Sequence, residues 1–405
     1  MQGDSVRRLL LYTWAASLPI HQLPIAAPWL RLGAGEWLFP LALLAAASWV
    51  TTTALRGSLK LLVPLAIGFA PAVVCSMDPP ASLLQLGVVL YVATILLVAF
   101  EAARRGHGSV VLAGFVCGVV MSCVWGWVRP QIDPWLAPGW PRPVGPTESP
   151  NMLAIQACTG ALSAAVLARD AGNPVLRRTA IAIAVGLVAT ALATLGHVVL
   201  AALVAGLFVA CRARHRRRAV ATATKLAFAA ATVLLVLSAR VRLLPLSIVA
   251  PFFDRRPNLY SAAHTVDLET FAGSPFAGVG LECFAKAWPH HDDGVRFAAN
   301  FAGGQEHLVG LPIDTHSTWL GYLAEGGLAG GLVLAVLVAL ALRARRDARP
   351  ELDVALVFAA GVGVFADVLT NRELALVTGA LAGLGAREAN RHAIAPPLVR
   401  SDRGP

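Results

Sequence analysis

The side chains of this sequence that could exchange a proton or bind an anion gather in polar stretches between long apolar runs. The clearest candidate is His316, near the end of the longest polar stretch and just before an apolar run that continues to Leu342. Leu320 and Leu323 follow at helical spacing, so His316 is expected at the head of an apolar stripe, at the start of a membrane helix. A neutral imidazole beside a polar loop can exchange a proton near pH 7.

A second group of side chains has the chemistry of an anion receptor. The ionisable groups that we predict at the outer surface come from loops distant in sequence: Arg142, His197, Arg255, Arg256, His264, His290, His291, His307 and His316. Arginine matches phosphate with two parallel charge-assisted hydrogen bonds, which indicates a site for an anionic head group. Arginines near a membrane also meet lipid phosphates with no further role. For Arg256, amid aromatic and polar residues, we favour the functional interpretation.

Metal and nucleotide chemistry find little support in the sequence. His290, His291, Asp292 and Asp293 are metal-ligand types, but adjacent residues chelate one ion poorly, so a solvated turn is the better interpretation and no metal is expected. The six cysteines form no CxxC pair, which argues against a zinc site or a disulfide framework. No Rossmann, P-loop or nucleic-acid motif is present. We therefore expect no cofactor and no nucleic-acid partner.

The composition places the chain in a membrane. Of its 405 residues, 57% are hydrophobic and only 14% are charged, and apolar runs of bilayer-spanning length recur along it. We predict an all-α polytopic membrane protein, one domain over residues 1–405 with about twelve transmembrane helices. The predicted spans are 9–30, 36–54, 60–77, 81–100, 109–128, 150–168, 179–196, 197–211, 220–239, 317–342, 352–370 and 373–387.

The basic residues predict the orientation of these spans. The formal net charge is +10, and Lys and Arg are concentrated in alternate loops. Because cytoplasmic loops are enriched in Lys and Arg, both termini are expected in the cytoplasm. The two longer polar segments, 129–149 and 240–315, then face outward. The second contains many aromatic residues, which predicts ordered structure, with short helices on the membrane surface.

Two acidic residues near predicted helix ends allow more than one interpretation. Asp367 is either a functional intramembrane acid or the partner of a helix-end group such as Asn371 or Arg372. In an unbroken helix Glu325 would lie opposite His316, but Gly326 and Gly327 leave the helix geometry open. We expect Glu325 to orient a neighbouring element rather than to do chemistry.

Three segments together resemble a known family, the bacterial O-antigen ligases and their polymerase relatives. The stretch from His316 to Gly330, HSTWLGYLAEGGLAG, is similar to the family's H-N/S-x-x-L-x-x-L-A-E-x-G-x-x-G. Arg256-Pro-Asn-Leu-Tyr260, followed by GSPFAGVG ending at Gly280, resembles R-x-x-x-W … N-P-x-x-G-V-G. The first outer segment resembles R-x-x-G … x-P-N-x-L-A, with Arg142 and Asn151 at the matching positions. The chain departs from the family where His197 replaces an arginine and Tyr260 a tryptophan.

The resemblance implies a GT-C-like glycosyltransferase of the bacterial inner membrane whose active site faces the periplasm. The donor would be a glycan linked to undecaprenyl diphosphate, and the expected acceptor is a hydroxyl of the lipid A core. Membrane lipids would surround the protein. His316 would be the general base and Arg256 the main diphosphate clamp. The other expected substrate contacts are Arg142, His197, Arg255, Asn151 and Tyr260, with Glu325 and Gly280 as structural residues. Such a reaction needs no metal, because fixed arginines can stabilise the leaving diphosphate.

Other activities remain open at this point. A repeat-unit polymerase and a protein O-oligosaccharyltransferase would use the same donor with another acceptor. A transporter or flippase would instead need paired acids or broken helices near the membrane midplane. Apart from Glu36, Asp367 and Glu325, which we expect near helix ends, the predicted spans hold no buried charge. That pattern, and the absence of an internal repeat, favour the enzyme.

Overall fold

The computed structural model describes most of the helical part of the chain. The described residues are 2–20, 34–47, 49, 52–132, 150–194, 259–287, 317–344, 350–363, 367 and 369–394. Their regular structure is entirely helical, with no strand among them, which confirms the all-α class. The helices are α1 (Gln2–Ser17), α2 (Ala34–Ala47), α3 (Thr52–Val74), α4 (Pro79–Ala102), η1 (Ala103–His107), α5 (Gly108–Ile132), α6 (Pro150–Asp170), α7 (Pro174–Ala193), α11 (Leu259–Gly273), α12 (Phe284–Ala287), α14 (Thr318–Ala344), α15 (Pro350–Val362) and α16 (Arg372–Ile394).

The protein is a membrane-embedded helical protein. Among the described residues, four helical stretches are long and apolar enough to cross a bilayer, namely Pro79–Val128, Asn151–Asp170, Pro174–Ala193 and Thr318–Ala341, and two shorter apolar helices cover 34–47 and 59–74. Ten of the twelve predicted spans overlap a described helix, and those over 197–211 and 220–239 lie outside the described residues. Helix α6 begins at Pro150, as its proline at the first helical position predicts.

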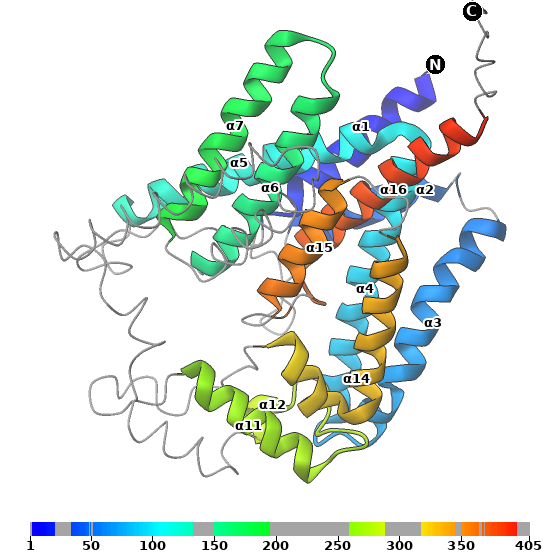
Figure 1. Cartoon of the computed structure of the whole chain (residues 1–405), viewed down its shortest axis with the longest axis vertical. Helices are drawn as coiled ribbons and strands as arrows, with labels where there is room; N and C mark the ends of the chain where they lie inside the picture. The colour runs from blue at the N-terminus through cyan, green and yellow to red at the C-terminus, as the bar shows by residue number, and fades with distance from the viewer. Residues whose placement is uncertain are drawn as a thin grey trace, which may run out of the picture.

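The longest apolar stretch is two helices joined at a kink. Its 50 residues would extend about 75 Å as one straight helix, far beyond a hydrocarbon core of about 30 Å. At Gly106 the backbone takes φ 99°, a left-handed value that glycine adopts readily, within the π-helical turn η1. The chain changes direction there, so α4 and α5 run at a steep angle to each other (Figure 1).

Helix α16 packs against α4 through closely spaced small residues. A Cβ added at Gly379 would lie 2.2 Å from the carbonyl oxygen of Leu96, and one at Gly383 would lie 2.2 Å from that of Phe100. The four-residue spacing puts both glycines on one face of α16, where the backbones can approach closely. This contact fixes α16 beside the helix that forms one wall of the candidate site.

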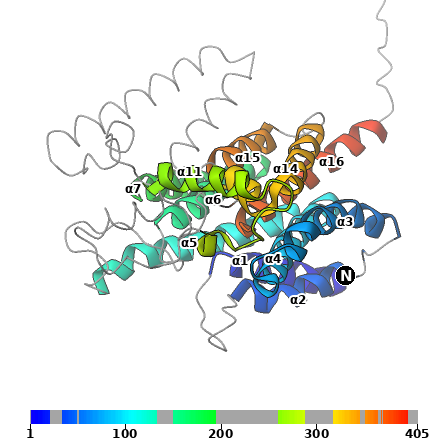
Figure 2. The ribbon, with the colours of Figure 1, turned by 90° about the horizontal axis from the view of Figure 1, so that it is seen from below.

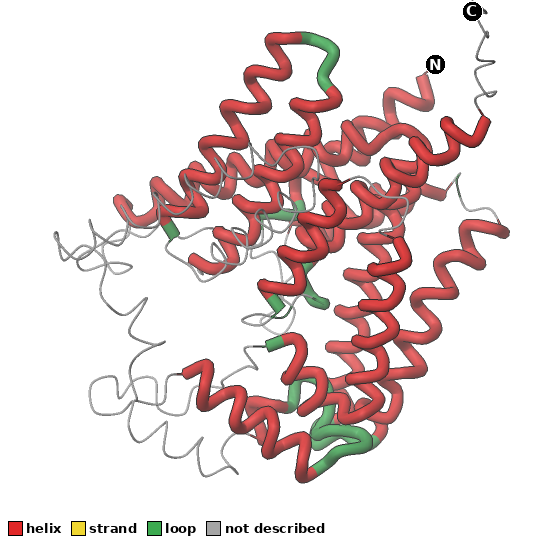
Figure 3. Tube along the Cα trace, viewed as in Figure 1, coloured by secondary structure: helices red, strands yellow, loops and turns green. Residues whose placement is uncertain are grey.

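The buried apolar side chains form one large and two smaller clusters. The largest joins α1, α2, α4, α5, α6, α7, α15 and α16, and one of the smaller joins α3, α4 and α14 around Phe69, Leu65 and Val333. The helices α3, α4 and α14 lie side by side in both views (Figures 1 and 2). At one end of this group, the connection between α11 and α12 folds back against α14 (Figure 3). The candidate site lies at that end.

Candidate functional site

The site begins at an interruption in α14. Gly327 has φ 59° and ψ −153°, so the helix is broken there, and this answers the question that the glycine pair left open. A turn over residues 274–283, between α11 and α12, docks against the break. Val279 N–H donates to the carbonyl of Ala324 at 3.1 Å, and Gly280 N–H donates to that of Glu325 at 3.0 Å. The break frees these carbonyls from α14, and the 274–283 turn satisfies them.

Glycine is required on both sides of this contact. A Cβ at Gly278, where φ is +69°, would lie 2.3 Å from the carbonyl carbon of Glu325. A Cβ at Gly327 would lie 2.5 Å from the carbonyl oxygen of Phe276. Beyond the break, Leu328 N–H donates to Pro275 O at 2.7 Å. The 274–283 turn therefore bonds to α14 on both sides of the interruption, through two of the segments that carry the family resemblance.

Glu325 lies inside this junction. Its side chain is only 6% exposed, and its Oε1 accepts a hydrogen bond from the backbone N–H of Phe284 at 3.2 Å. The carboxylate thus holds the start of α12 against α14. Gly280, with φ +107°, lies so close to the connection between α3 and α4 that a Cβ there would meet the Ser76 hydroxyl at 2.0 Å. Both residues lie among the contacts that shape the junction.

The 274–283 turn is also tied to the start of α4. Ser82 Oγ donates to the carbonyl of Leu281 at 2.8 Å, and Met77 N–H donates to the carbonyl of Val279 at 2.9 Å. On the outside of the same junction, Lys286 of α12 forms an ion pair with Asp78, the N-cap of α4. The turn is therefore held between two membrane helices, α4 and α14.

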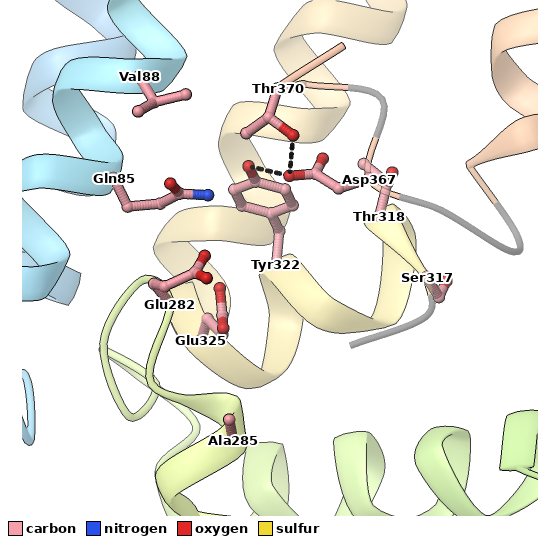
Figure 4. Close-up of a pocket in the computed structure, with 10 residues that line it drawn as sticks. All are labelled: Gln85, Val88, Glu282, Ala285, Ser317, Thr318, Tyr322, Glu325, Asp367 and Thr370. Atoms are coloured by element: carbon pink, nitrogen blue, oxygen red, sulfur yellow. Dashed lines mark hydrogen bonds between the residues drawn. The ribbon is translucent and has the colours of Figure 1, made fainter. Parts of the chain in front are cut away.

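These contacts border a partly open cavity of about 300 Å³ with a largely polar wall. Its lining residues are Gln85, Val88, Glu282, Ala285, Ser317, Thr318, Tyr322, Glu325, Asp367 and Thr370. They come from α4, the 274–283 turn, α12, the start of α14 and the connection between α15 and α16 (Figure 4). Side chains from five separate parts of the chain converge on one space.

Several hydrogen bonds hold the carboxylate of Asp367 in the cavity wall. One carboxylate oxygen, Oδ2, accepts from the Tyr322 hydroxyl at 3.1 Å and from the Thr370 hydroxyl at 2.9 Å, as Figure 4 shows. The other oxygen accepts from the backbone N–H of Leu369 at 2.9 Å. Arg372, the expected helix-end partner, forms an ion pair with Glu36 of α2. Asp367 therefore faces the cavity with its orientation fixed from three sides.

Most of the predicted catalytic and binding residues lie outside the described residues: His316, Arg256, Arg255, Arg142 and His197. Asn151 is half-buried near the start of α6, and Tyr260 belongs to the first turn of α11. Glu325 and Gly280 are brought together at the junction described above. Ser317, the residue that follows His316 in the sequence, lines the cavity.

No model of a protein family and no curated protein sequence matches this chain. The resemblance to the O-antigen ligases therefore depends on the motifs and their order alone. The structure adds a physical reason for two of these motifs, because the glycines of both are needed where the 274–283 turn meets α14.

The expectation that the spans hold no buried charge beyond Glu36, Asp367 and Glu325 is wrong. Glu373, near the start of α16, is fully buried, and its Oε1 accepts from the side-chain amide of Gln156 at 3.0 Å. The same amide nitrogen lies 3.1 Å from the carbonyl of Pro19, just past the end of α1. The polar groups converge only after α1, α6 and α16 have packed, which is why the sequence does not reveal them.

Proposed function

We propose that this protein is a glycosyltransferase of the O-antigen-ligase type, embedded in the bacterial inner membrane with about twelve spans. Its active site faces the periplasm, and both chain termini lie in the cytoplasm. It moves a glycan from undecaprenyl diphosphate to an acceptor hydroxyl, most directly one on the lipid A core. A repeat-unit polymerase or a protein O-oligosaccharyltransferase differs from this proposal only in the acceptor.

One observation carries the proposal. The GSPFAGVG segment and the LAEGGLAG segment, which resemble two separate family motifs, hydrogen-bond to each other across the break in α14. The cavity that results is lined by Ser317 and Thr318, so its wall begins one residue after His316. A motif histidine next in sequence to a polar cavity, in a helix of membrane-spanning length, supports a site for chemistry at a membrane face.

The proposed reaction follows from the residue types. The acceptor oxygen attacks the anomeric carbon and forms the new glycosidic bond, and its proton passes to the imidazole of His316. The bond from that carbon to the phosphate oxygen breaks, and the electron pair leaves with the lipid diphosphate. Arg256, with Arg255, Arg142 and His197, binds the negative charge that develops there. A positioned base typically contributes about 10²- to 10⁴-fold to such a rate.

The direct test is transfer in vitro by the purified full-length protein, with a defined lipid-linked donor and a panel of acceptors, with and without a chelator. We expect His316→Ala to lower the rate by at least about 100-fold, because the base is lost. The matched control is His215→Ala, in a basic loop that we predict on the cytoplasmic side. Full transfer by correctly inserted His316→Ala protein would refute the proposal.

A deletion strain separates the acceptors. Loss of a ligase leaves long lipid-linked polymer that is not attached to lipopolysaccharide. Loss of a polymerase leaves single repeat units attached to the core. Attachment of glycan to protein serine or threonine, lost on deletion, would identify the oligosaccharyltransferase.

A transporter or flippase is the second candidate, and the buried Glu373 favours it. A buried carboxylate bonded to a glutamine amide between membrane helices is the kind of group that ion-coupled carriers use. Glycan-lipid movement by the purified protein in liposomes, abolished by Glu373→Gln and without glycan transfer, would establish this alternative. Glycan transfer that survives Glu373→Gln would exclude Glu373 from the chemistry.

A further inference from the structure

The charge of the cavity beside the α14 break limits what can bind there. Three of its lining residues are carboxylic acids, Glu282, Glu325 and Asp367, and none is a lysine or an arginine. Lys286 of α12 forms an ion pair with Asp78 and does not line the cavity. A phosphate or diphosphate placed there would meet three carboxyl groups and no lysine or arginine among the lining residues to balance its charge.

The wall nevertheless offers many hydrogen-bonding groups that an uncharged ligand can use. Asp367 is held by Tyr322 and Thr370, and a carboxylate has lone pairs for further donors. The amide of Gln85 projects from α4 toward the Tyr322 ring (Figure 4). An amide both donates and accepts, so the wall combines strong acceptors with a donor.

Glu282 supplies an independent indication of function. It has φ 59°, and among the described residues it is the one non-glycine residue with a positive φ. The left-handed region is unfavourable for a residue with a Cβ, and such residues persist where the surrounding structure enforces them, often at ligand sites. Here the conformation directs the side chain into the space beside Glu325 (Figure 4), rather than away from the molecule.

We infer that this cavity is a subsite for an uncharged sugar ring, recognised through its hydroxyl groups. Sugar hydroxyls are donors for Glu282 and Asp367 and acceptors for the amide of Gln85, while Val88, Ala285 and the Tyr322 ring offer apolar contact to ring C–H groups. The volume of about 300 Å³ is at the lower end of ligand pockets, typically about 300 to 1,000 Å³, and suits one sugar residue rather than a lipid tail.

A metal ion is a poorer occupant than a sugar. Among the described residues, no three His, Cys, Asp or Glu side chains are grouped as metal ligands would be. Asp367 and Glu325 already direct oxygens to protein donors rather than to a common centre. Glu282 and Glu325 lie side by side, whereas Asp367 lies beyond the Tyr322 ring from them (Figure 4).

This inference rests on the proposed function, because that function brings a glycan to this face of the protein. It deepens the proposal by dividing the substrate between two places. The sugar occupies the acidic cavity next in sequence to His316, and the diphosphate is held elsewhere by the predicted arginines. The sugar can belong to the acceptor or to the donor glycan, and the two sources differ in which Michaelis constant they affect.

The test uses the full-length protein in nanodiscs and two binding probes. The first is a pair of phosphate-free oligosaccharides, one from the lipopolysaccharide core and one from the repeat unit, and the second is inorganic pyrophosphate. Glu282→Gln removes the charge with little change of shape, and Thr370→Val removes the hydroxyl that orients Asp367. Glu269→Gln is the matched control, on an exposed acid of α11 that does not line the cavity.

We expect at least one oligosaccharide to bind the wild-type protein, and Glu282→Gln and Thr370→Val to weaken it by about 10-fold or more, as loss of a charge-assisted hydrogen bond does. Pyrophosphate affinity should stay unchanged or increase in Glu282→Gln, and Glu269→Gln should match the wild type. In transfer assays the same variants should raise KM for the acceptor if the sugar is the acceptor's, and for the donor if it is the donor's.

Three results would overturn the subsite. The first is wild-type protein that binds neither oligosaccharide. The second is Glu282→Gln and Thr370→Val variants that bind the oligosaccharide as tightly as the wild type does. The third is variants that lose binding of pyrophosphate and keep binding of the sugar. Retained sugar binding by a wild-type protein that transfers no glycan would refute the proposed transferase and leave the subsite standing. Size-exclusion profiles identify a variant that fails to fold, and the other cavity variant then decides the question.

Discussion

Gly278 is the position where the docking of the 274–283 turn can be tested most directly. Its φ of +69° is left-handed, and a Cβ there would lie 2.3 Å from the carbonyl carbon of Glu325. Gly278→Ala therefore adds one methyl group where the turn and the broken helix are in backbone contact. We expect this substitution to separate the turn from α14.

The size of the effect follows from what the methyl group displaces. A left-handed conformation costs a residue with a Cβ about 1 to 2 kcal/mol. Moving the turn away also breaks the bonds from Val279 to Ala324 and from Gly280 to Glu325. Each is worth about 0.5 to 1.5 kcal/mol, so the free energy of unfolding should fall by about 2 to 5 kcal/mol in all.

The measurement is equilibrium unfolding of the purified protein in mixed micelles, followed by circular dichroism. The control is Gly273→Ala at the end of α11, where a Cβ meets no atom within 4 Å and no left-handed φ is present. The control should match the wild type within about 0.5 kcal/mol. If Gly278→Ala were as stable as Gly273→Ala, the turn would not be docked as described.

Two further predictions concern the groups around the cavity. Tyr322→Phe removes the hydroxyl that donates to Asp367, so we expect the rate of glycan transfer to fall about 3- to 10-fold with little loss of folded protein. An unchanged transfer rate would show that this hydrogen bond does not contribute to the reaction. The hydrogen bond from Lys286 holds the pKa of Asp78 below its ordinary value. The Asp78–Lys286 pair therefore stabilises the fold fully above the pKa of Asp78 in the unfolded chain, about 3.9. This stability is lost as pH falls through the lower pKa of Asp78 in the folded protein. The pair is exposed, so its contribution to stability should also shrink in high salt. In thermal unfolding, Asp78→Asn should remove this dependence of stability on pH and on salt. If the variant kept both, the pair would not be their source.

Apolar run length predicted where ten of the described helices lie, but not α11 or α12, because a bilayer requires about 20 apolar residues per crossing. Pro150 marked the start of α6 for a local reason, since its ring suits the first helical position. The break at Gly327 was left open, because a glycine pair permits a break without requiring one. The contact with the 274–283 turn decides it, and that contact joins segments about 50 residues apart.

The polar cavity was harder to foresee for the same reason. Tyr322 reads as part of an apolar run and Thr370 as the last residue of a predicted span. Thr370 donates to Asp367 within the α15–α16 connection, but Tyr322 does so only because α14 packs against that connection. Glu282 carries no sequence signal at all, since its unusual backbone conformation depends on its neighbours. Polar residues inside apolar runs, Asp367, Glu325 and Gln85, are the signals that point toward the cavity.

The interruption of α14 also constrains how the protein enters the membrane. A helix broken inside a span leaves carbonyl groups bare, and in lipid each such group costs several kcal/mol unless protein covers it. The residues that bond to those of Ala324 and Glu325 lie in the 274–283 turn, which leaves the ribosome before α14 does. Biosynthesis therefore supplies the partner first. The order of the two segments in the gene matches the order that insertion requires, and a circular permutation placing α14 ahead of the turn should reach the membrane with this helix incompletely inserted.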